Sequence, residues 1–314
     1  MFTLAHLSDP HVGPLPRTRL RELCNKRVLG YLSWKVRRAA VHVPHVLRAL
    51  VDDVHEAGAD HIVVTGDITN ISLPEEFVLA AQWLKTLGSP ETVTIVPGNH
   101  DAYVGVPWES SLGLWSAYMV GVRKGQERPP ASFDDFPFVR VVGDIALVGV
   151  STARPMAPFF ATGAAGAAQL DALARVLEDL ADRGLHRIVL IHHPPLAAST
   201  RARKRLVDGQ RFRDVIAHAG AELVLHGHAH RSTFASLSTA AGDVPVVGAS
   251  SASAGRHAGD DHYARYHLYR IERSHGRWDV EVEVRGLSAD GSSFTTEQKL
   301  KLPPQPSSTA NAGA

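Results

Sequence analysis

Side chains that can bind metal ions gather in five short clusters along this chain. The clusters are Asp9-Pro10-His11, Gly66-Asp67, Gly98-Asn99-His100-Asp101, His192-His193 and Gly227-His228-Ala229-His230. Nearly every cluster follows a short apolar run that is typical of a buried strand, so the strands would deliver carboxylate, amide and imidazole groups to one edge of a sheet. Donors collected in this way are what a two-metal hydrolytic site needs.

The spacing within the clusters suggests individual roles. Two divalent ions held ~3.5–4 Å apart need a carboxylate between them, because a shared negative oxygen offsets their repulsion. Asp67 directly follows a buried run and a glycine, and we interpret it as this bridge. Asp9 and His11 lie two residues apart, as do His228 and His230, so each pair can chelate one ion. Mixed ligands of these types favour manganese, iron or zinc over magnesium or calcium.

Apolar runs and helical periodicity alternate along most of the chain and predict the elements that position the clusters. Strands are expected at residues 2–7, 61–65, 92–96, 187–191 and 222–225, a hairpin at 138–150, and helices at 43–57, 74–87, 170–183 and 212–218. This order indicates a layered α/β fold. Further strands at residues 244–247, 266–271 and 278–284 favour a second sheet packed on the first.

Composition narrows the class of protein. The 314 residues are 44% hydrophobic, enough for a sizeable core, and the net charge of +1 argues against a nucleic-acid partner. The single cysteine, Cys24, allows no intrachain disulfide and is expected to be a small buried hydrophobe. No signal peptide and no long apolar span is visible, so we expect a cytoplasmic protein. Residues 1–302 are expected to form one domain and 303–314 a disordered tail.

All five clusters, in this order, resemble the motifs of the calcineurin-like metallophosphoesterase superfamily, with the bacterial class III cyclic-nucleotide and glycerophosphodiester phosphodiesterases as the nearer match. The resemblance implies a four-layer α/β/β/α sandwich of two packed mixed β-sheets flanked by helices. It also implies two divalent metal ions and a proton donor or transition-state stabiliser, His100, oriented by Asp101. The implied ligands are Asp9, His11, Asp67 and His230 for the first ion, and Asp67, Asn99, His192 and His228 for the second.

Two histidines beside the implied ligands are expected to have other roles. His193 follows one ligand and His226 precedes another by two residues. Strand alternation would turn the His193 side chain to the opposite face from that of His192, and a structural or supporting role is expected for both histidines.

Two basic loops could select the substrate. The segment Arg17 to Arg38 has eight cationic residues against one glutamate, interleaved with Leu29, Tyr31, Leu32 and Trp34. Residues 17–42 could form a cap that either holds an anionic or lipid-bearing phosphate ester or touches an anionic membrane. Alternatively, they form a helix that packs on the domain and keeps its charges in water. The loop Arg201 to Arg205 fits phosphate recognition and a solvated turn equally well.

The leading functional hypothesis is a dinuclear phosphodiesterase that acts on a small phosphodiester such as a cyclic nucleotide. The alternative is a phosphatase or pyrophosphatase that acts on a lipid-linked nucleotide at a membrane surface. A nuclease would call for a long basic groove, and a non-catalytic scaffold of this fold would lack some of the ligands, none of which is missing here. The oligomeric state is left open, with a dimer allowed.

Overall fold

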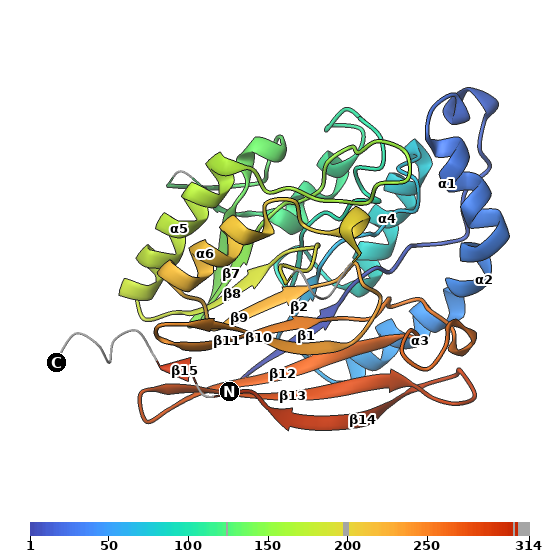
Figure 1. Cartoon of the computed structure of the whole chain (residues 1–314). Coiled ribbons are helices and arrows are strands. Elements are labelled where there is room, and N and C mark those ends of the chain that lie inside the picture. The colour runs from blue at the N-terminus through green and yellow to red at the C-terminus, as the bar shows by residue number, and fades with distance from the viewer. Residues whose placement is uncertain (124, 197–200, 304, 307–314) are drawn as a thin grey trace.

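Two β-sheets pack face to face in the computed structural model, which describes residues 1–123, 125–196, 201–303 and 305–306. Helices flank the pair of sheets (Figure 1). The α/β fold expected from the sequence is therefore confirmed. None of the described helices is long and apolar enough to cross a membrane.

The first sheet combines the start and the end of the chain in the order β14-β13-β12-β1-β2-β3. Its strands β1, β2 and β3 are parallel, and β12 joins β1 antiparallel. The bounds are β1 Phe2–Leu7, β2 His61–Val64, β3 Val93–Ile95, β12 Arg265–Ser274, β13 Arg277–Leu287 and β14 Phe294–Lys301. The short strand β15, Gln305–Pro306, pairs with β13, so the ordered chain continues past the expected start of the tail, while residues 307–314 lie outside the described residues.

The second sheet is built from the middle of the chain in the order β10-β11-β9-β8-β7-β6-β4-β5. Its strands β7, β8, β9 and β11 are parallel neighbours at the centre. The bounds are β4 Gly121–Arg123, β5 Gln126–Arg128, β6 Phe138–Val142, β7 Ile145–Gly149, β8 His186–Leu190, β9 Leu223–His226, β10 Thr233–Thr239 and β11 Gly242–Gly248.

The location of the C-terminal strands corrects the sequence prediction. The three strands predicted there were expected to form a second sheet, but only one of them, β11, belongs to the second sheet, whereas β12 and β13, together with β14, extend the first. The reason is that β2 pairs with only one edge of β1. The other edge of β1 would be unpaired, and β12 pairs with it over five residue pairs. The strands β4, β5, β10 and β14 have no counterpart in the prediction, because their apolar content is low.

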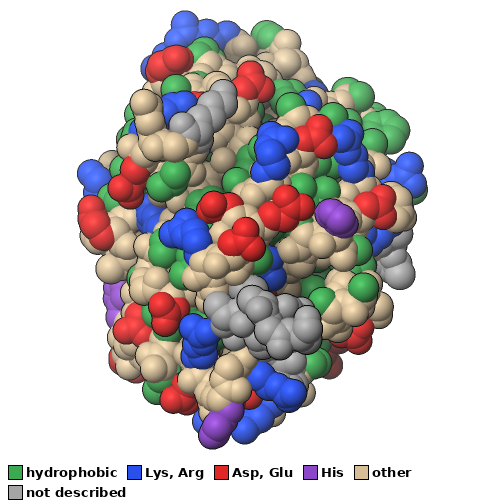
Figure 2. Space-filling view, turned by 90° about the vertical axis from the view of Figure 1, so that its left-hand side faces the viewer, with side chains coloured by type: hydrophobic (Ala, Val, Ile, Leu, Met, Phe, Trp, Pro, Cys, Tyr) green, Lys and Arg blue, Asp and Glu red, His purple; other side chains and the backbone are tan. Residues whose placement is uncertain are grey.

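The helices are amphipathic and pack their apolar stripes on the sheets. The α-helices of the sandwich are α3 Pro44–Glu56, α4 Pro74–Leu87, α5 Ala167–Asp182 and α6 Gly209–Ala219, with 3-10 turns η3 Leu112–Met119, η4 Phe133–Asp135, η6 Ala202–Lys204 and η7 Arg256–Ala258. Helices α5 and α6 cover the outer face of the second sheet. On the face shown in Figure 2, acidic and basic side chains are interspersed.

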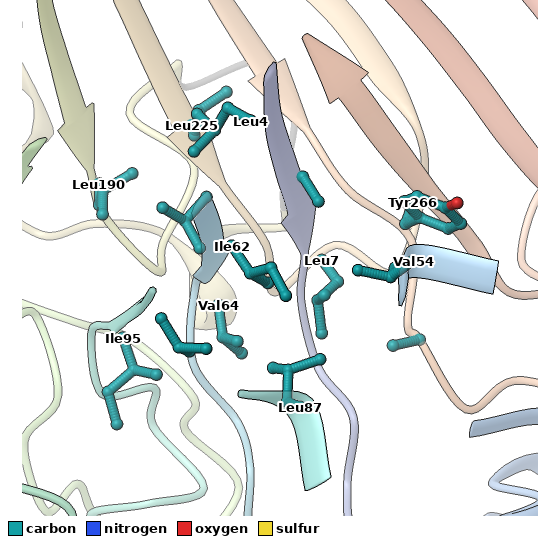
Figure 3. Close-up of a cluster of buried hydrophobic side chains, with 14 of the residues drawn as sticks. Leu4, Leu7, Val54, Ile62, Val64, Leu87, Ile95, Leu190, Leu225 and Tyr266 are labelled. Carbon is teal, nitrogen blue, oxygen red and sulfur yellow. The ribbon is translucent and has the colours of Figure 1, made fainter. Parts of the chain in front are cut away.

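Strand alternation buries both faces of the second sheet. Along β8, Ile188 and Leu190 face the first sheet, whereas Val189 and Ile191, just past its end, face α5 and α6. Figure 3 shows side chains of the cluster between the sheets, drawn from β1, β2, β3, β8 and β9. Each fully buried side chain of this size contributes about 1.5–3 kcal/mol of hydrophobic stabilisation. This core fixes the strands whose ends bear the polar clusters.

Residues 17–42 form a helical cap at the edge of the molecule (Figure 1). It comprises η1 Leu20–Leu23, α1 Arg27–Ser33, a π-helical stretch η2 Trp34–Arg38 and α2 Ala39–Val41. Cys24 is exposed in this cap, so the expectation of a buried cysteine was wrong. The cause is that only one side of the cap packs on the body.

Candidate metal centre

The polar clusters meet because parallel strands of both sheets end at the same edge. In the first sheet, β1, β2 and β3 lead to Asp9, Asp67 and Asn99. In the second sheet, β8 and β9 lead to His192 and His228. The carboxyl ends of parallel strands are the usual place for a ligand site in α/β proteins, and here two such edges lie together.

Five of the seven expected ligands have left-handed backbone. The φ angles are 50° at Asp9, 40° at His11, 56° at Asp67, 67° at His228 and 53° at His230. Residues other than glycine rarely adopt this conformation, which costs on the order of 1–3 kcal/mol each. Backbone strain concentrated at these positions is typical of a functional site.

Glycines beside the expected ligands allow side chains from neighbouring strand ends to approach the backbone closely. A Cβ atom on Gly98 would overlap Asp67 and lie 2.8 Å from His192 Cε1. A Cβ atom on Gly227 would overlap the side chain of Ser8 and lie 2.5 Å from Asp9 Oδ2. The glycines at these two clusters are therefore required by packing as well as by the turns.

The donors of the first expected ion lie close together. His230 Nε2 is 3.1 Å from Asp9 Oδ1 and 3.4 Å from His11 Nε2. His42, from the end of the cap, joins this group, since its donor atom lies within 4.8 Å of those of His11 and His230. Buried Asp9 Oδ1 has no hydrogen-bond partner besides the nearby His230 Nε2, so it can bind a cation in place of that contact.

The donors of the second expected ion form an adjoining group. His192 Nε2 lies 3.3 Å from Asp67 Oδ2 and 3.2 Å from Asn99 Oδ1. His228 Nδ1 lies 3.3 Å from His192 Nε2, and its own Nε2 is buried without a partner. Donor atoms of Asp9, Asp67 and His192 lie within 4.8 Å of one another, so Asp67 lies where the two groups meet.

Backbone carbonyl groups orient two of the imidazole rings. His11 Nδ1 lies 3.1 Å from the Thr69 carbonyl oxygen, and His192 Nδ1 lies 2.6 Å from that of Thr65. Each ring can donate Nδ1–H to its carbonyl, which leaves Nε2 as the metal-binding atom. This is the tautomer that a divalent ion requires.

Burial and neighbouring charges set the protonation of the donors. Burial lowers the pKa of His11 and His228 well below the ordinary value, so both rings are neutral at neutral pH. Burial raises the pKa of Asp9, but His230 outweighs it and keeps that pKa low. Burial lowers the pKa of His192, but Asp67 and then Asp9 outweigh it and raise the pKa to about 9, so a bound cation would take the place of this proton. The donor set fits a pair of divalent ions.

His100 and Asp101 lie beside the donors but do not bond to each other through their side chains. The His100 ring contacts the carbonyl oxygen of Asn70 through Nδ1 and lies 5.0 Å from the His11 ring. Asp101 accepts hydrogen bonds from the backbone N–H groups of Thr69 (2.8 Å) and Gly98 (2.9 Å). Asp101 therefore orders the loops around Asp67 and Asn99, whereas the sequence prediction had it orienting the His100 ring.

The two neighbouring histidines differ in their surroundings. His193 does not turn away from the donors as strand alternation suggested, because its donor atom lies within 4.8 Å of those of His192 and His228. Its Nδ1 pairs with Thr152 Oγ1 at 2.7 Å, so it supports the site from a hydrogen-bonded position. His226 is buried, with Nδ1 3.1 Å from the carbonyl oxygen of Gly227.

Arg38 contacts the site from one basic loop and Lys204 is influenced by the charges of the site from the other, and sequence reasoning did not single out either residue. Arg38 Nη2 lies 3.0 and 3.2 Å from the two ring nitrogens of His11, and Arg38 Nη1 lies 3.3 Å from His100 Nδ1. Burial lowers the pKa of Lys204, while Asp9 and Asp67 act in the opposite direction, so its ammonium group interacts with both carboxylates. The only sequence signal for either residue was its place in a basic run.

Taken together, the fold and the site define an α/β protein with a metal-binding centre at the joint edge of two packed sheets. The chain belongs to the calcineurin-like phosphoesterase family, whose model matches residues 2–232. It is a phosphoric ester hydrolase, and the family implies a dinuclear divalent metal centre. No curated protein matches the sequence.

Several solved structures share the fold. A dimetal phosphatase from Danio rerio is similar over 96% of this chain and 98% of its own, with a TM-score of 0.61 and 13% identity. The purple acid phosphatase PPD1 from yellow lupin is similar over 96% of this chain and 53% of its own, with a TM-score of 0.57 and 11% identity. GAP50 of Plasmodium, described as an anchor in the inner membrane complex, matches over 96% and 88%, with a TM-score of 0.51 and 11% identity. Similarity at these identities establishes the fold.

Proposed function

We propose that this hydrolase is a phosphodiesterase that acts on a small phosphodiester such as a cyclic nucleotide. The observation that supports the proposal is the convergence of the seven expected metal ligands and His100 at one edge, with Arg38 beside them and Lys204 on a second basic loop. When bound, a pair of manganese, iron or zinc ions would polarise the phosphoryl group and activate water for attack. Asp9, His11, Asp67 and His230 would hold one ion, and Asp67, Asn99, His192 and His228 the other.

The remaining groups would bind the substrate and assist the leaving group. Arg38 and Lys204 add positive charge beside the donors, which favours a small anionic substrate and stabilises charge that develops on phosphoryl oxygens. His100 can donate Nδ1–H to Asn70, which leaves Nε2 as the nitrogen that can interact with substrate. Nε2 can assist departure of an alkoxide only when it also carries a proton, so the ring must hold a proton on both nitrogens at that step.

One specific observation favours a second candidate, a phosphatase or pyrophosphatase that acts on a lipid-linked nucleotide. Arg38 belongs to the cap, so the residue that reaches the metal donors also connects them to an exposed basic surface. A nuclease is less well supported, because the net charge is only +1. A cytoplasmic location remains part of the proposal.

The two candidates are tested with purified protein supplied with manganese. The diesterase should cleave bis(p-nitrophenyl) phosphate faster than p-nitrophenyl phosphate. Asp67→Asn should abolish turnover of both, which excludes a contaminating enzyme. Asp171→Asn, which changes an exposed aspartate paired with Arg211, should leave turnover unchanged and is the matched control. Faster cleavage of the monoester by the wild type would refute the diesterase proposal.

A further inference from the structure

Within the cap, α1 and η2 follow each other directly and form one helical segment over residues 27–38, the cap helix. One side of the cap helix is fixed to the body of the protein. Arg27 donates from Nε to the Ile71 carbonyl oxygen at 3.1 Å. Gly30 lies against Ile71 and Tyr103, where a Cβ atom would be 2.6 Å from the Ile71 side chain. Arg38 reaches His11, as described above. These contacts decide which face of the helix turns outward.

The opposite face of the same helix presents aliphatic side chains to solvent. Val28, Leu32 and Val36 follow one another at intervals of four residues, and Leu32 and Val36 are 53% and 78% exposed. Leu20, in the preceding turn, is 87% exposed. An outward stripe of this kind contributes nothing to the core and is typical of a surface that meets an apolar phase.

The cap that bears this aliphatic stripe also exposes basic side chains. Five exposed cations lie within residues 17–42, namely Arg17, Arg19, Arg21, Lys35 and Arg37. The only acidic residue in the cap, Glu22, accepts a hydrogen bond from the backbone of Arg19. The face shown in Figure 2, by contrast, mixes both signs of charge. The cap is therefore a local cationic surface on a nearly neutral protein.

A second exposed apolar segment is tied to the cap. Lys26 Nζ donates to the Met156 carbonyl oxygen at 2.6 Å, and the same loop continues to Phe159 and Phe160, of which Phe159 is 79% exposed. The next residue, Ala161, donates from its backbone to the Arg203 carbonyl oxygen at 2.9 Å. Apolar and cationic side chains thus continue from the cap across two neighbouring loops.

We propose that this surface docks on an anionic lipid bilayer. The apolar side chains would enter the interface while the cations bind lipid phosphates, each worth about 1 kcal/mol near a charged leaflet. Because Arg38 lies on the same helix and contacts His11, docking would bring the metal-binding edge close to lipid headgroups. The proposal goes beyond the reaction and does not depend on it.

The test is flotation of the manganese-loaded protein with vesicles of phosphatidylglycerol and phosphatidylcholine, and with vesicles of phosphatidylcholine alone. The wild type should float with the anionic vesicles, and high salt should weaken this binding. Leu32→Gln/Val36→Gln should weaken it about tenfold or more. Val122→Gln/Val141→Gln, which changes two exposed valines on the second sheet, should bind like the wild type.

A charge variant separates cationic binding at the cap from a general effect of net charge. Arg17→Glu/Arg21→Glu should abolish flotation, whereas Arg175→Glu/Arg183→Glu on and beside α5 should not. Cleavage of bis(p-nitrophenyl) phosphate in solution should be unchanged in all four variants, so loss of docking is distinguishable from loss of the enzyme.

Three results would overturn the proposal: no preference of the wild type for anionic vesicles, equal binding by cap and control variants, or a dimer that Leu32→Gln/Val36→Gln converts to a monomer without any vesicle binding. The last result would assign the face to self-association.

Discussion

Asp101 should be essential for the stability of the metal-binding edge although it binds no metal in this account. Its two carboxylate oxygens accept hydrogen bonds from the backbone of Thr69 and of Gly98, and both donors are buried. Asp101→Ala would leave two buried N–H groups without an acceptor. Each orphaned donor costs about 1–3 kcal/mol, so we expect the free energy of unfolding to fall by about 2–6 kcal/mol.

Urea unfolding of the metal-free protein, followed by tryptophan fluorescence, to which buried Trp115 contributes, measures this change. Asp171→Ala is the matched control, because its ion pair with Arg211 is exposed and should be worth less than about 1 kcal/mol. A loss below about 1 kcal/mol for Asp101→Ala would refute the argument that this carboxylate holds the two loops together.

Three further substitutions test the site and its support. Arg38→Ala should lower kcat/KM about 10²–10³-fold with unchanged metal content, while Arg37→Ala should not; equal activity of the two variants would remove the role of Arg38. His100→Ala should lower kcat about 10²–10⁴-fold with metal content intact, and near-normal turnover would show that the ring takes no part. Glu222→Ala should cost about 3–5 kcal/mol in urea unfolding, because it leaves buried Arg187 without its carboxylate; a negligible loss would mean that water or backbone groups suffice there.

The positions of the expected ligands at the strand ends could be predicted from the sequence because each position is fixed by a local rule. A buried strand followed by a turn positions Asp67 at the end of β2, and the same holds for His192 after β8. Glycine at position 227 allows the tight approach that brings His228 to Asp9, where its backbone donates to Asp9 Oδ2 at 2.9 Å. Short-range pattern and strand direction are enough to place such residues.

Other features depend on contacts that the sequence does not encode locally. Arg38 is one of eight cations in its segment, and only the docking of the cap against Ile71 turns it toward His11. His42 reaches the first group of donors through a hydrogen-bonded pair with Ser253, more than 200 residues away. The pairing of β12 with β1 spans a similar separation. Long-range packing selects these partners, so residue types alone did not reveal them.

The central claim is that this chain holds two metal ions through a shared carboxylate, and metal content tests it most directly. The protein is stripped with a chelator, reloaded with manganese, desalted and measured by mass spectrometry for metal per chain. We expect two ions per chain in the wild type and in Asp171→Asn, and a clear loss in Asp67→Asn. One ion or none in the wild type, or two in Asp67→Asn, would contradict the account.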